Sequence, residues 1–271
     1  MRGQTRRTRV VLPALLVICA LIGSSLAWSG PAAASQPART AAVELLPDLE
    51  LAPLYGLVIK TNKKGRKRIR FGTRAFNIGA GPLEVVGRAR DAKVMREVVQ
   101  RIYDSDGGFR ERGPSNMSMF WAGDGHNHWH VERFINVELY KVGALSSTRR
   151  IRKLGFCLLD LVKSSNPPAN ASPTRGYPFD TCGKTVSVDS ITMGISVGWA
   201  DDYFPTTTYQ WIDVTTLPKG VYRLCAKVNP VGAWTESNLA NNFFWRDVYI
   251  DAKGSLVEIR KSGRTRCGSF A

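Results

Sequence analysis

Short runs of apolar residues, several of them alternating with polar residues, recur along this chain from about residue 69 onward. Such runs are typical of β-strands, and we expect strands at about residues 69–77, 82–87, 96–103, 131–140, 153–160, 210–215, 220–228 and 243–250. Turn-forming residues separate them, and no long stretch has the period of an amphipathic helix. The pattern therefore predicts a mostly β fold, a β-sandwich core with long irregular loops in a single domain.

The N-terminal residues have the order of an export signal. Basic residues come first, an apolar stretch from Val10 to Trp28 follows, and small residues end in the A-x-A pattern of Ala32 and Ala34. We interpret residues 1–34 as a secretory signal peptide that is cleaved. A retained anchor is the alternative, because the apolar stretch approaches the roughly 20 residues that span a bilayer. With the signal removed, we expect an extracellular protein with no stable membrane span.

Two further boundaries follow from this interpretation. Residues 35–45 are expected to be a flexible lead-in, and residues 46–271 are left for one folded domain with a large core. The pair Arg6-Arg7 is a weak match to a twin-arginine export signal, because Arg9 stands where that signal prefers an apolar residue.

The chain is strongly basic. It has 38 Lys and Arg against 22 Asp and Glu, a net charge of +16, and residues 1–34 hold four of the basic and none of the acidic residues, which leaves +12. An exported protein of this charge is expected to meet anionic polymers, such as those of a cell wall, whereas export disfavours nucleic acid as a partner. The densest charge, from Lys63 to Arg68, is interpreted as a solvated hairpin tip.

Four cysteines remain beyond the signal peptide, and an even number in an exported chain favours disulfides. In the strand expected at 220–228, Cys225 shares the outer face with charged residues, where it can tie down the C-terminal tail through Cys267. Cys157 would then pair with Cys182 and close the long loop between them. The chain has no C-x-x-C pair, which argues against a thiolate zinc site.

The three histidines of the chain lie within five residues, at His126, His128 and His130. Imidazole is a common ligand of late first-row metals, so this spacing predicts a metal site. On an extended strand the outer α-carbons would lie about 13 Å apart, near the limit for sharing one ion. We therefore expect a bend, which Gly123 and Gly125 permit. The all-nitrogen set suits copper or zinc, and spacing alone does not separate a copper oxidase from a zinc hydrolase.

Three ordered motifs, over roughly residues 67–250, resemble the lysyl oxidase family of copper amine oxidases. The first is the histidine segment. In the second, Lys153 lies three residues before Phe-Cys-Leu. In the third, Tyr203 lies seven residues before Gln-Trp-Ile-Asp, which ends at Asp213. After it come a turn and a strand, and then Val228-Asn-Pro230, Glu236-Ser237 and Asn241-Asn242.

The resemblance implies a cofactor and an activity. It assigns copper to the three histidines and a lysine tyrosylquinone cofactor to Lys153 and Tyr203. It implies that residues 46–271 are a catalytic domain like that of protein-lysine 6-oxidase. Such a domain uses O2 to oxidise primary amines, lysyl side chains among them, to aldehydes, with release of hydrogen peroxide and ammonia.

A carboxylate must also act as the base in such a reaction. Asp213 fits the family motif, although an Asp after Trp-Ile equally caps a turn or orients a histidine. Asp124, Asp201 and Asp202 are local candidates. Without the resemblance, Lys153 is interpreted as a surface charge and Tyr203 as a loop aromatic.

The chain also departs from the animal members of the family. Those enzymes have more disulfides and a cysteine just before the first ligand histidine, where Gly125 stands here. Their collagen and elastin substrates therefore do not carry over, and the amine stays open. Two other functions remain as alternatives. One is an exported β-sandwich adhesion or wall-binding module with a structural copper site, and the other is a zinc hydrolase.

Overall fold

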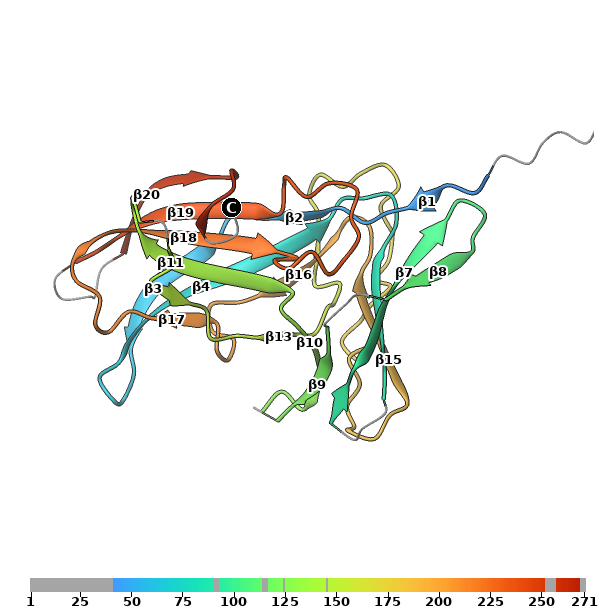
Figure 1. The fold of residues 1–271 in the computed structure, drawn as a ribbon, viewed down its shortest axis with the longest axis horizontal. Coiled ribbons are helices and arrows are strands. Elements are labelled where there is room, and N and C mark those ends of the chain that lie inside the picture. The colour runs from blue at the N-terminus through green and yellow to red at the C-terminus, as the bar shows by residue number, and fades with distance from the viewer. Residues whose placement is uncertain are drawn as a thin grey trace, which may run out of the picture. The chain divides into compact units, whose positions relative to one another are not determined.

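The computed structural model describes residues 41–89, 93–113, 117–123, 125–144, 146–251 and 257–268, and for 257–259 the backbone alone. The secondary-structure elements of this part are all β-strands, β1 to β20, arranged in four antiparallel sheets (Figure 1). The expected signal peptide lies outside the described residues. No helix among the residues described has the length and apolar character to cross a membrane.

Two of the sheets form the sandwich. The first has the order β12-β11-β18-β19-β20. Its strands are β11 (Ile135–Lys141), β12 (Arg149–Arg150), β18 (Gly220–Val228), β19 (Phe243–Ile250) and β20 (Val257–Gly263). The second is built around β4 (Lys67–Asn77). The strands that join it are β2 (Leu49–Leu51), β3 (Tyr55–Thr61), β14 (Val162–Lys163), β16 (Trp199–Tyr203) and β17 (Trp211–Asp213).

Alternation along the strands explains why these two sheets pack face to face. Leu224 and Ala226 of β18 are fully buried, as are Ile69 and Phe71 of β4, and all four belong to one apolar cluster. Contacts of β18 and β19 with β2, and of β20 with β3, join the layers. The mostly β, single-domain sandwich expected from the sequence is therefore confirmed.

The other two sheets lie beside this sandwich and include the histidine segment. One has the order β1-β7-β5-β15, with β8 added to β7, and the other has the order β13-β10-β9-β6. The bounds of the first are β1 (Glu44–Leu45), β5 (Leu83–Arg88), β7 (Glu97–Asp104), β8 (Phe109–Arg112) and β15 (Ser190–Ile195). Those of the second are β6 (Val94–Met95), β9 (Met119–Ala122), β10 (His128–Glu132) and β13 (Gly155–Phe156).

Both expected disulfides are present. Cys157 bonds to Cys182 and Cys225 bonds to Cys267. The first ties the loop before β15 to the segment that follows β13, and the second packs the C-terminal segment on the outer side of β18.

Some strand boundaries differ from those expected. The run at 131–140 is two strands, because Arg133 has a φ of 53° and interrupts the extended backbone between β10 and β11. Of the run at 153–160, only Gly155–Phe156 is paired. Glu44 and Leu45, at the end of the expected lead-in, pair with β7.

Candidate active site

The histidine segment is held by antiparallel pairing between β9 and β10. His128 pairs with Ala122, and His130 pairs with Phe120. His126 lies in the turn before β10, where Gly125 has a φ of 98° and Asn127 a φ of 48°. The bend expected from the H-x-H-x-H spacing is therefore present.

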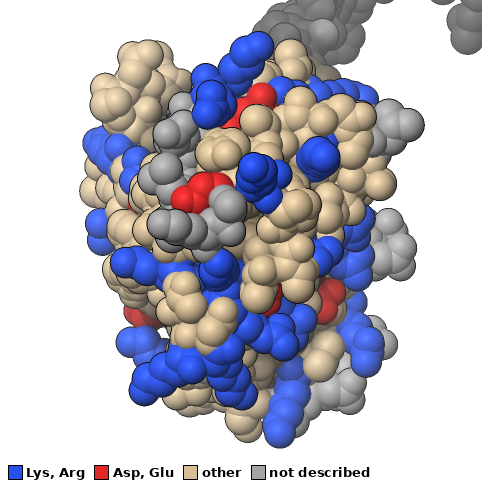
Figure 2. Space-filling model, turned by 90° about the vertical axis from the view of Figure 1, so that its left-hand side faces the viewer, with Lys and Arg blue, Asp and Glu red and all other residues tan. Residues whose placement is uncertain are grey.

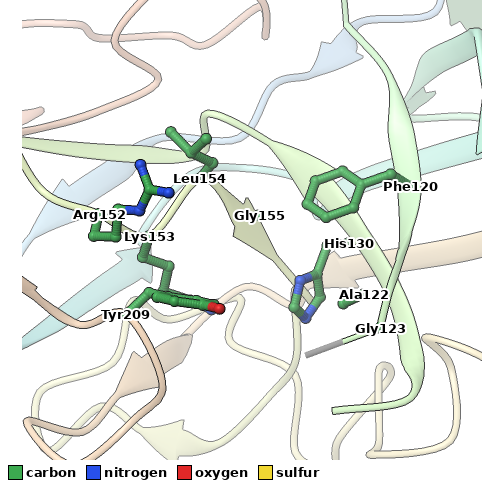
Figure 3. Close-up of a pocket in the computed structure, with 9 residues that line it drawn as sticks. All are labelled: Phe120, Ala122, Gly123, His130, Arg152, Lys153, Leu154, Gly155 and Tyr209. Atoms are coloured by element: carbon green, nitrogen blue, oxygen red, sulfur yellow. The ribbon is translucent and has the colours of Figure 1, made fainter. Parts of the chain in front are cut away.

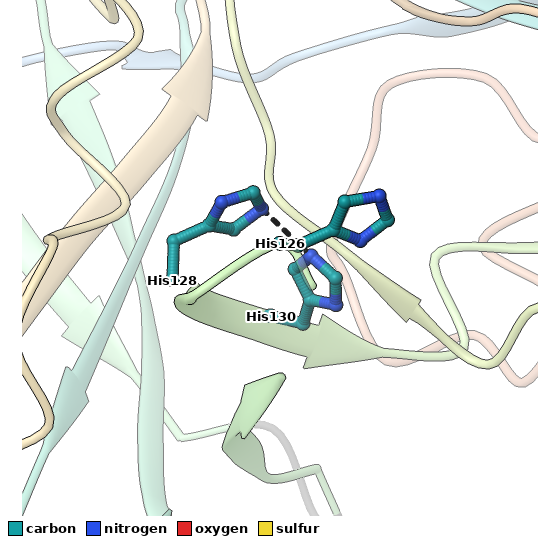
Figure 4. A group of neighbouring side chains, drawn as sticks. All are labelled: His126, His128 and His130. Carbon is teal, nitrogen blue, oxygen red and sulfur yellow. Dashed lines mark hydrogen bonds between the residues drawn. The ribbon is translucent and has the colours of Figure 1, made fainter. Parts of the chain in front are cut away.

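The bend turns the three rings toward one another (Figure 4). One nitrogen from each ring lies within 4.8 Å of the others, and the Nε2 atoms of His128 and His130 are 2.8 Å apart. A metal ion that binds imidazole at about 2 Å needs ligand nitrogens a little over 3 Å apart, so small ring rotations suffice. The three histidines therefore fit a late first-row metal ion.

His130 is the most buried of the three rings. The edge-to-face contact with Phe120 has a centroid distance of 5.8 Å. Burial, followed by the positive charges of Lys153, His128 and His126, lowers the pKa of His130 to about 2. The ring is therefore neutral at ordinary pH and has a nitrogen lone pair available for a metal.

Lys153 and Tyr203 come together beside this cluster. Lys153 is buried between β12 and β13, and its Nζ lies 4.6 Å from the centroid of the Tyr203 ring. The Phe156 ring meets the Tyr203 ring edge to face, with 5.1 Å between centroids. Without the family resemblance, the sequence predicts that Lys153 is a charge on the protein surface. Because Lys153 is buried, that interpretation is wrong.

Tyr203 is fixed at the end of β16, opposite Thr73 of β4. Its hydroxyl accepts a hydrogen bond from the Cys157 N–H at 2.6 Å and donates one to the Cys157 carbonyl at 2.9 Å. Burial raises the pKa of Tyr203 well above its usual value, and the nearby carboxyl of Asp201 raises it further. The phenol is therefore neutral, and its position depends on a disulfide-bonded residue.

Two neighbouring aspartates of β16 have opposite surroundings. Asp202 accepts hydrogen bonds from the Tyr55 hydroxyl at 2.7 Å and from Arg74 Nη2 at 2.8 Å. Asp201 is fully buried, and neither of its side-chain oxygens has a hydrogen-bond partner of good geometry among the described residues.

Burial raises the pKa of Asp201 well above its usual range. The positive charge of Lys153 and the N–H groups of Asp202 and Leu159 oppose this shift. Asp201 is thus a carboxyl whose protonated form burial favours and whose ionised form Lys153 favours, next to a lysine and a tyrosine.

Two cavities meet at His130. The first, here called the histidine cavity, has a volume of about 380 Å³. Its lining includes His126, His128, His130, Asp201, Asp202 and Tyr203. The second, the lysine cavity, has a volume of about 260 Å³ and is lined by Lys153 and Tyr209 on one side and by His130 and Phe120 on the other (Figure 3).

The structure brings five of the six predicted site residues together, and Asp213 is the exception. On β17, Asp213 forms an ion pair with Arg66 at 3.3 Å and accepts a hydrogen bond from the Thr215 N–H at 3.0 Å. Asp213 therefore caps a turn, as one of the two other interpretations of this residue predicted. Asp124 lies outside the described residues.

Two other tyrosines, Tyr177 and Tyr209, lack the seven-residue offset from Gln210 that marks Tyr203. The Tyr177 hydroxyl donates to Glu84 at 2.7 Å, and Tyr209 lines the lysine cavity. The sequence reasoning also missed Tyr55 and Arg74, which hold Asp202. A signal for Arg74 was present, because Arg68, Arg70 and Arg74 recur at even positions along β4.

Comparison with known proteins now identifies the family. The family model described as lysyl oxidase matches residues 99–259, which include the histidine segment, Lys153 and Tyr203. Lysyl oxidase homolog 2 of Gallus gallus is 29% identical over 131 residues, which is 48% of this chain and 15% of that relative. The match thus spans a small part of the relative's length. The family model covers more than half of the chain, and the chain therefore belongs to the lysyl oxidase family.

Proposed function

We propose that this protein is an exported, copper-dependent amine oxidase that converts primary amines to aldehydes with release of hydrogen peroxide and ammonia. Membership of the lysyl oxidase family supports an oxidoreductase acting on amines with O2. Lysyl side chains are among the substrates proposed. The proposal includes a lysine tyrosylquinone cofactor formed from Lys153 and Tyr203.

The observation that carries the proposal is the distance of 4.6 Å between Lys153 Nζ and the centre of the Tyr203 ring. Burying a lysine lowers the stability of the fold unless its amine is paired, so a buried lysine is often retained for its chemistry. Here the amine faces a phenol that lines the same cavity as three histidines. A cross-link between these two side chains needs little movement of the backbone.

The chain's own residues prepare this chemistry. His126, His128 and His130 would hold copper, which when bound supplies the one-electron chemistry with O2 that oxidises the phenol and later the reduced cofactor. Cys157 fixes the phenol oxygen through two hydrogen bonds. The packing of Phe156 against the Tyr203 ring excludes water from one side of it.

We assign the role of base to Asp201 instead of Asp213. Asp201 lines the histidine cavity with Tyr203, whereas Asp213 lies in a separate hollow with Arg66. A carboxyl whose pKa is raised by burial can take a proton near neutral pH and return it. In its ionised form, which the positive charge of Lys153 favours, Asp201 can accept the proton of Lys153 before the cross-link forms. Once it has released that proton, it can accept the α-proton of a bound amine.

The remaining expectations stay part of the proposal. Residues 1–34 would direct export, and residues 46–271 would form the catalytic domain. The two disulfides fit an extracellular location. Binding of an anionic cell-wall polymer remains a prediction from the net charge, and Figure 2 shows many Lys and Arg and few Asp and Glu side chains on the face it displays. The adhesion-module alternative is not favoured, because a binding module does not require a buried lysine beside a buried tyrosine.

Peroxide release tests the proposed function. Copper-loaded protein, kept in air, is given a panel of primary amines, and hydrogen peroxide is measured. We expect amine-dependent peroxide from the parent protein and from Tyr209→Phe, and none above background from Tyr203→Phe. If no amine yields peroxide, or if Tyr203→Phe keeps its activity, the proposed function is wrong.

A further inference from the structure

Two phenylalanines stand at the opening of the histidine cavity with most of their surface in water. Phe179 is 67% exposed and Phe204 is 54% exposed, and both line this cavity. Each ring thus leaves apolar surface in water that contact with an apolar group would remove. Exposed apolar side chains at the mouth of a cavity commonly bind a ligand or a partner.

Phe179 is held in place by its neighbours in the chain. The Thr181 N–H and hydroxyl both donate to the Pro178 carbonyl, at 3.1 and 2.8 Å, and close a turn around Phe179. The next residue, Cys182, is bonded to Cys157 and accepts a hydrogen bond from the Trp129 N–H at 2.9 Å. The ring is thus presented from a braced turn.

Phe204 is braced from a different part of the chain. Its carbonyl accepts a hydrogen bond from the Thr207 N–H at 2.9 Å. The Arg70 guanidinium of β4 donates to the carbonyls of Pro205 and Thr207. The loop that follows Tyr203 is therefore fixed to the sheet, and the Phe204 ring stays outside the core.

The lining of this cavity also includes apolar and basic side chains. Leu161 and Val162 add apolar surface, and Arg175, whose guanidinium lies 5.6 Å from the centroid of the Trp199 ring, adds a positive charge. A second ammonium group on a bound amine would meet Arg175, whereas an apolar group would meet the phenyl rings. The mouth therefore disfavours diamines and favours amines that carry an apolar group.

We propose that Phe179 and Phe204 form a specificity site that selects primary amines bearing a bulky apolar group. This inference rests on the proposed function, because it takes the amine to Tyr203 at the inner end of the histidine cavity. The apolar group stays at the mouth, between the two rings, while the amine reaches the inner wall. Two sources share this chemistry: free arylalkylamines, and lysines with apolar neighbours in a polypeptide.

Steady-state kinetics with matched amines test the proposal. We expect kcat/KM for 4-phenylbutylamine to exceed that for butylamine by roughly tenfold or more, and 1,4-diaminobutane to be the poorest of the three. In Phe179→Ala and Phe204→Ala the preference for the phenyl group should fall to about twofold. Phe109→Ala removes an equally exposed ring, 51% exposed on β8, and should leave the preference unchanged.

Peptides separate the two sources. A lysine flanked by leucines is compared with the same peptide flanked by glutamines. A leucine preference that Phe204→Ala abolishes indicates a polypeptide substrate, and a preference confined to 4-phenylbutylamine indicates a free amine. The proposal would be overturned by equal kcat/KM for the apolar and the non-apolar substrate, both among the amines and among the peptides. An unchanged preference in both alanine variants would overturn it as well.

Binding without turnover keeps this test separate from the proposed function. The probe is 4-phenylbutanol, which has no amine to oxidise, and its Kd is measured by calorimetry with the copper-loaded protein. We expect roughly tenfold weaker binding in each alanine variant and no change in Phe109→Ala. Absence of peroxide together with this binding pattern would reject the amine oxidase and keep the apolar site. Equal Kd values in all variants would reject the site.

Discussion

The two cavities that meet at His130 differ in chemistry. The histidine cavity is lined by the three imidazoles, two carboxyls, the Tyr203 phenol and two exposed phenylalanines. The lysine cavity is smaller and holds Lys153 beside Tyr209. The proposed lysine and tyrosine precursors thus line different cavities, yet Lys153 Nζ approaches the Tyr203 ring to 4.6 Å. A cross-link between them would join the two cavities through their common wall.

The largest effect on activity is expected when either precursor of the cofactor is replaced. Lys153→Met and Tyr203→Phe should each lower amine-dependent peroxide release by at least about a thousandfold, because neither can form the quinone. Lys163→Met is the matched control, since Lys163 Nζ lies 5.8 Å from the Trp199 ring. Residual activity above a tenth of the parent rate in Lys153→Met would contradict a role for that amine.

The two aspartates of β16 sharpen the contrast within the histidine cavity. Asp201→Asn should lower kcat about a hundredfold or more, because the base is lost, while the melting temperature changes little. Asp202→Asn should instead destabilise the fold by about 3 kcal/mol, because Arg74 and Tyr55 lose a buried partner. Denaturant unfolding and single-turnover kinetics measure the two effects. The opposite assignment of effects would show that Asp202 is the base.

A smaller effect is expected in the lysine cavity. Leu154→Trp places a larger ring at its edge, where Leu154 is exposed. If amines enter through the histidine cavity, kcat/KM of the mature enzyme should stay within about threefold of the parent value. A loss above tenfold for every amine would mean that substrate or O2 passes through the lysine cavity.

The last effect concerns stability and the pH dependence of the metal-free protein. The pKa of His130 is lowered to about 2 in the folded chain, from an ordinary value near 6.5. The unfolded chain therefore binds more protons at acidic pH, and the stability that this ring contributes is present above pH 6.5 and lost as pH falls. We expect the loss to approach 1.4 kcal/mol per pH unit below pH 6. Denaturant unfolding of His130→Gln should show a slope smaller by that amount, and an unchanged slope would contradict the assignment.

The sequence predicted the parts of this molecule that depend on local pattern. The alternation of apolar and polar residues along β4 and β18 predicted which faces pack in the sandwich. The bend at Gly125 was predicted because the three imidazoles on an extended strand would lie too far apart to share one ion easily. The disulfide pairing followed from the outward face of Cys225. No local sequence pattern marked Lys153 and Tyr203, which were identified through the family resemblance.

Other features depend on contacts between distant segments. The strand β16 is buried along its whole length, so it lacks alternation and its Asp-Asp-Tyr sequence resembles a turn. Asp202 differs from Asp201 in that Arg74 and Tyr55 reach it from other strands. Asp213 matched the family motif, but pairing of β17 with β4 places it beside Arg66.

The central claim is that Lys153 and Tyr203 become one cofactor. The direct measurement is peptide mass spectrometry of copper-loaded protein that has been kept in air, with a metal-free sample as control. We predict that the peptides containing Lys153 and Tyr203 are recovered as one cross-linked species only after copper loading, and that Lys153→Met abolishes it. Recovery of both peptides unlinked and unmodified from protein with copper bound would contradict the claim.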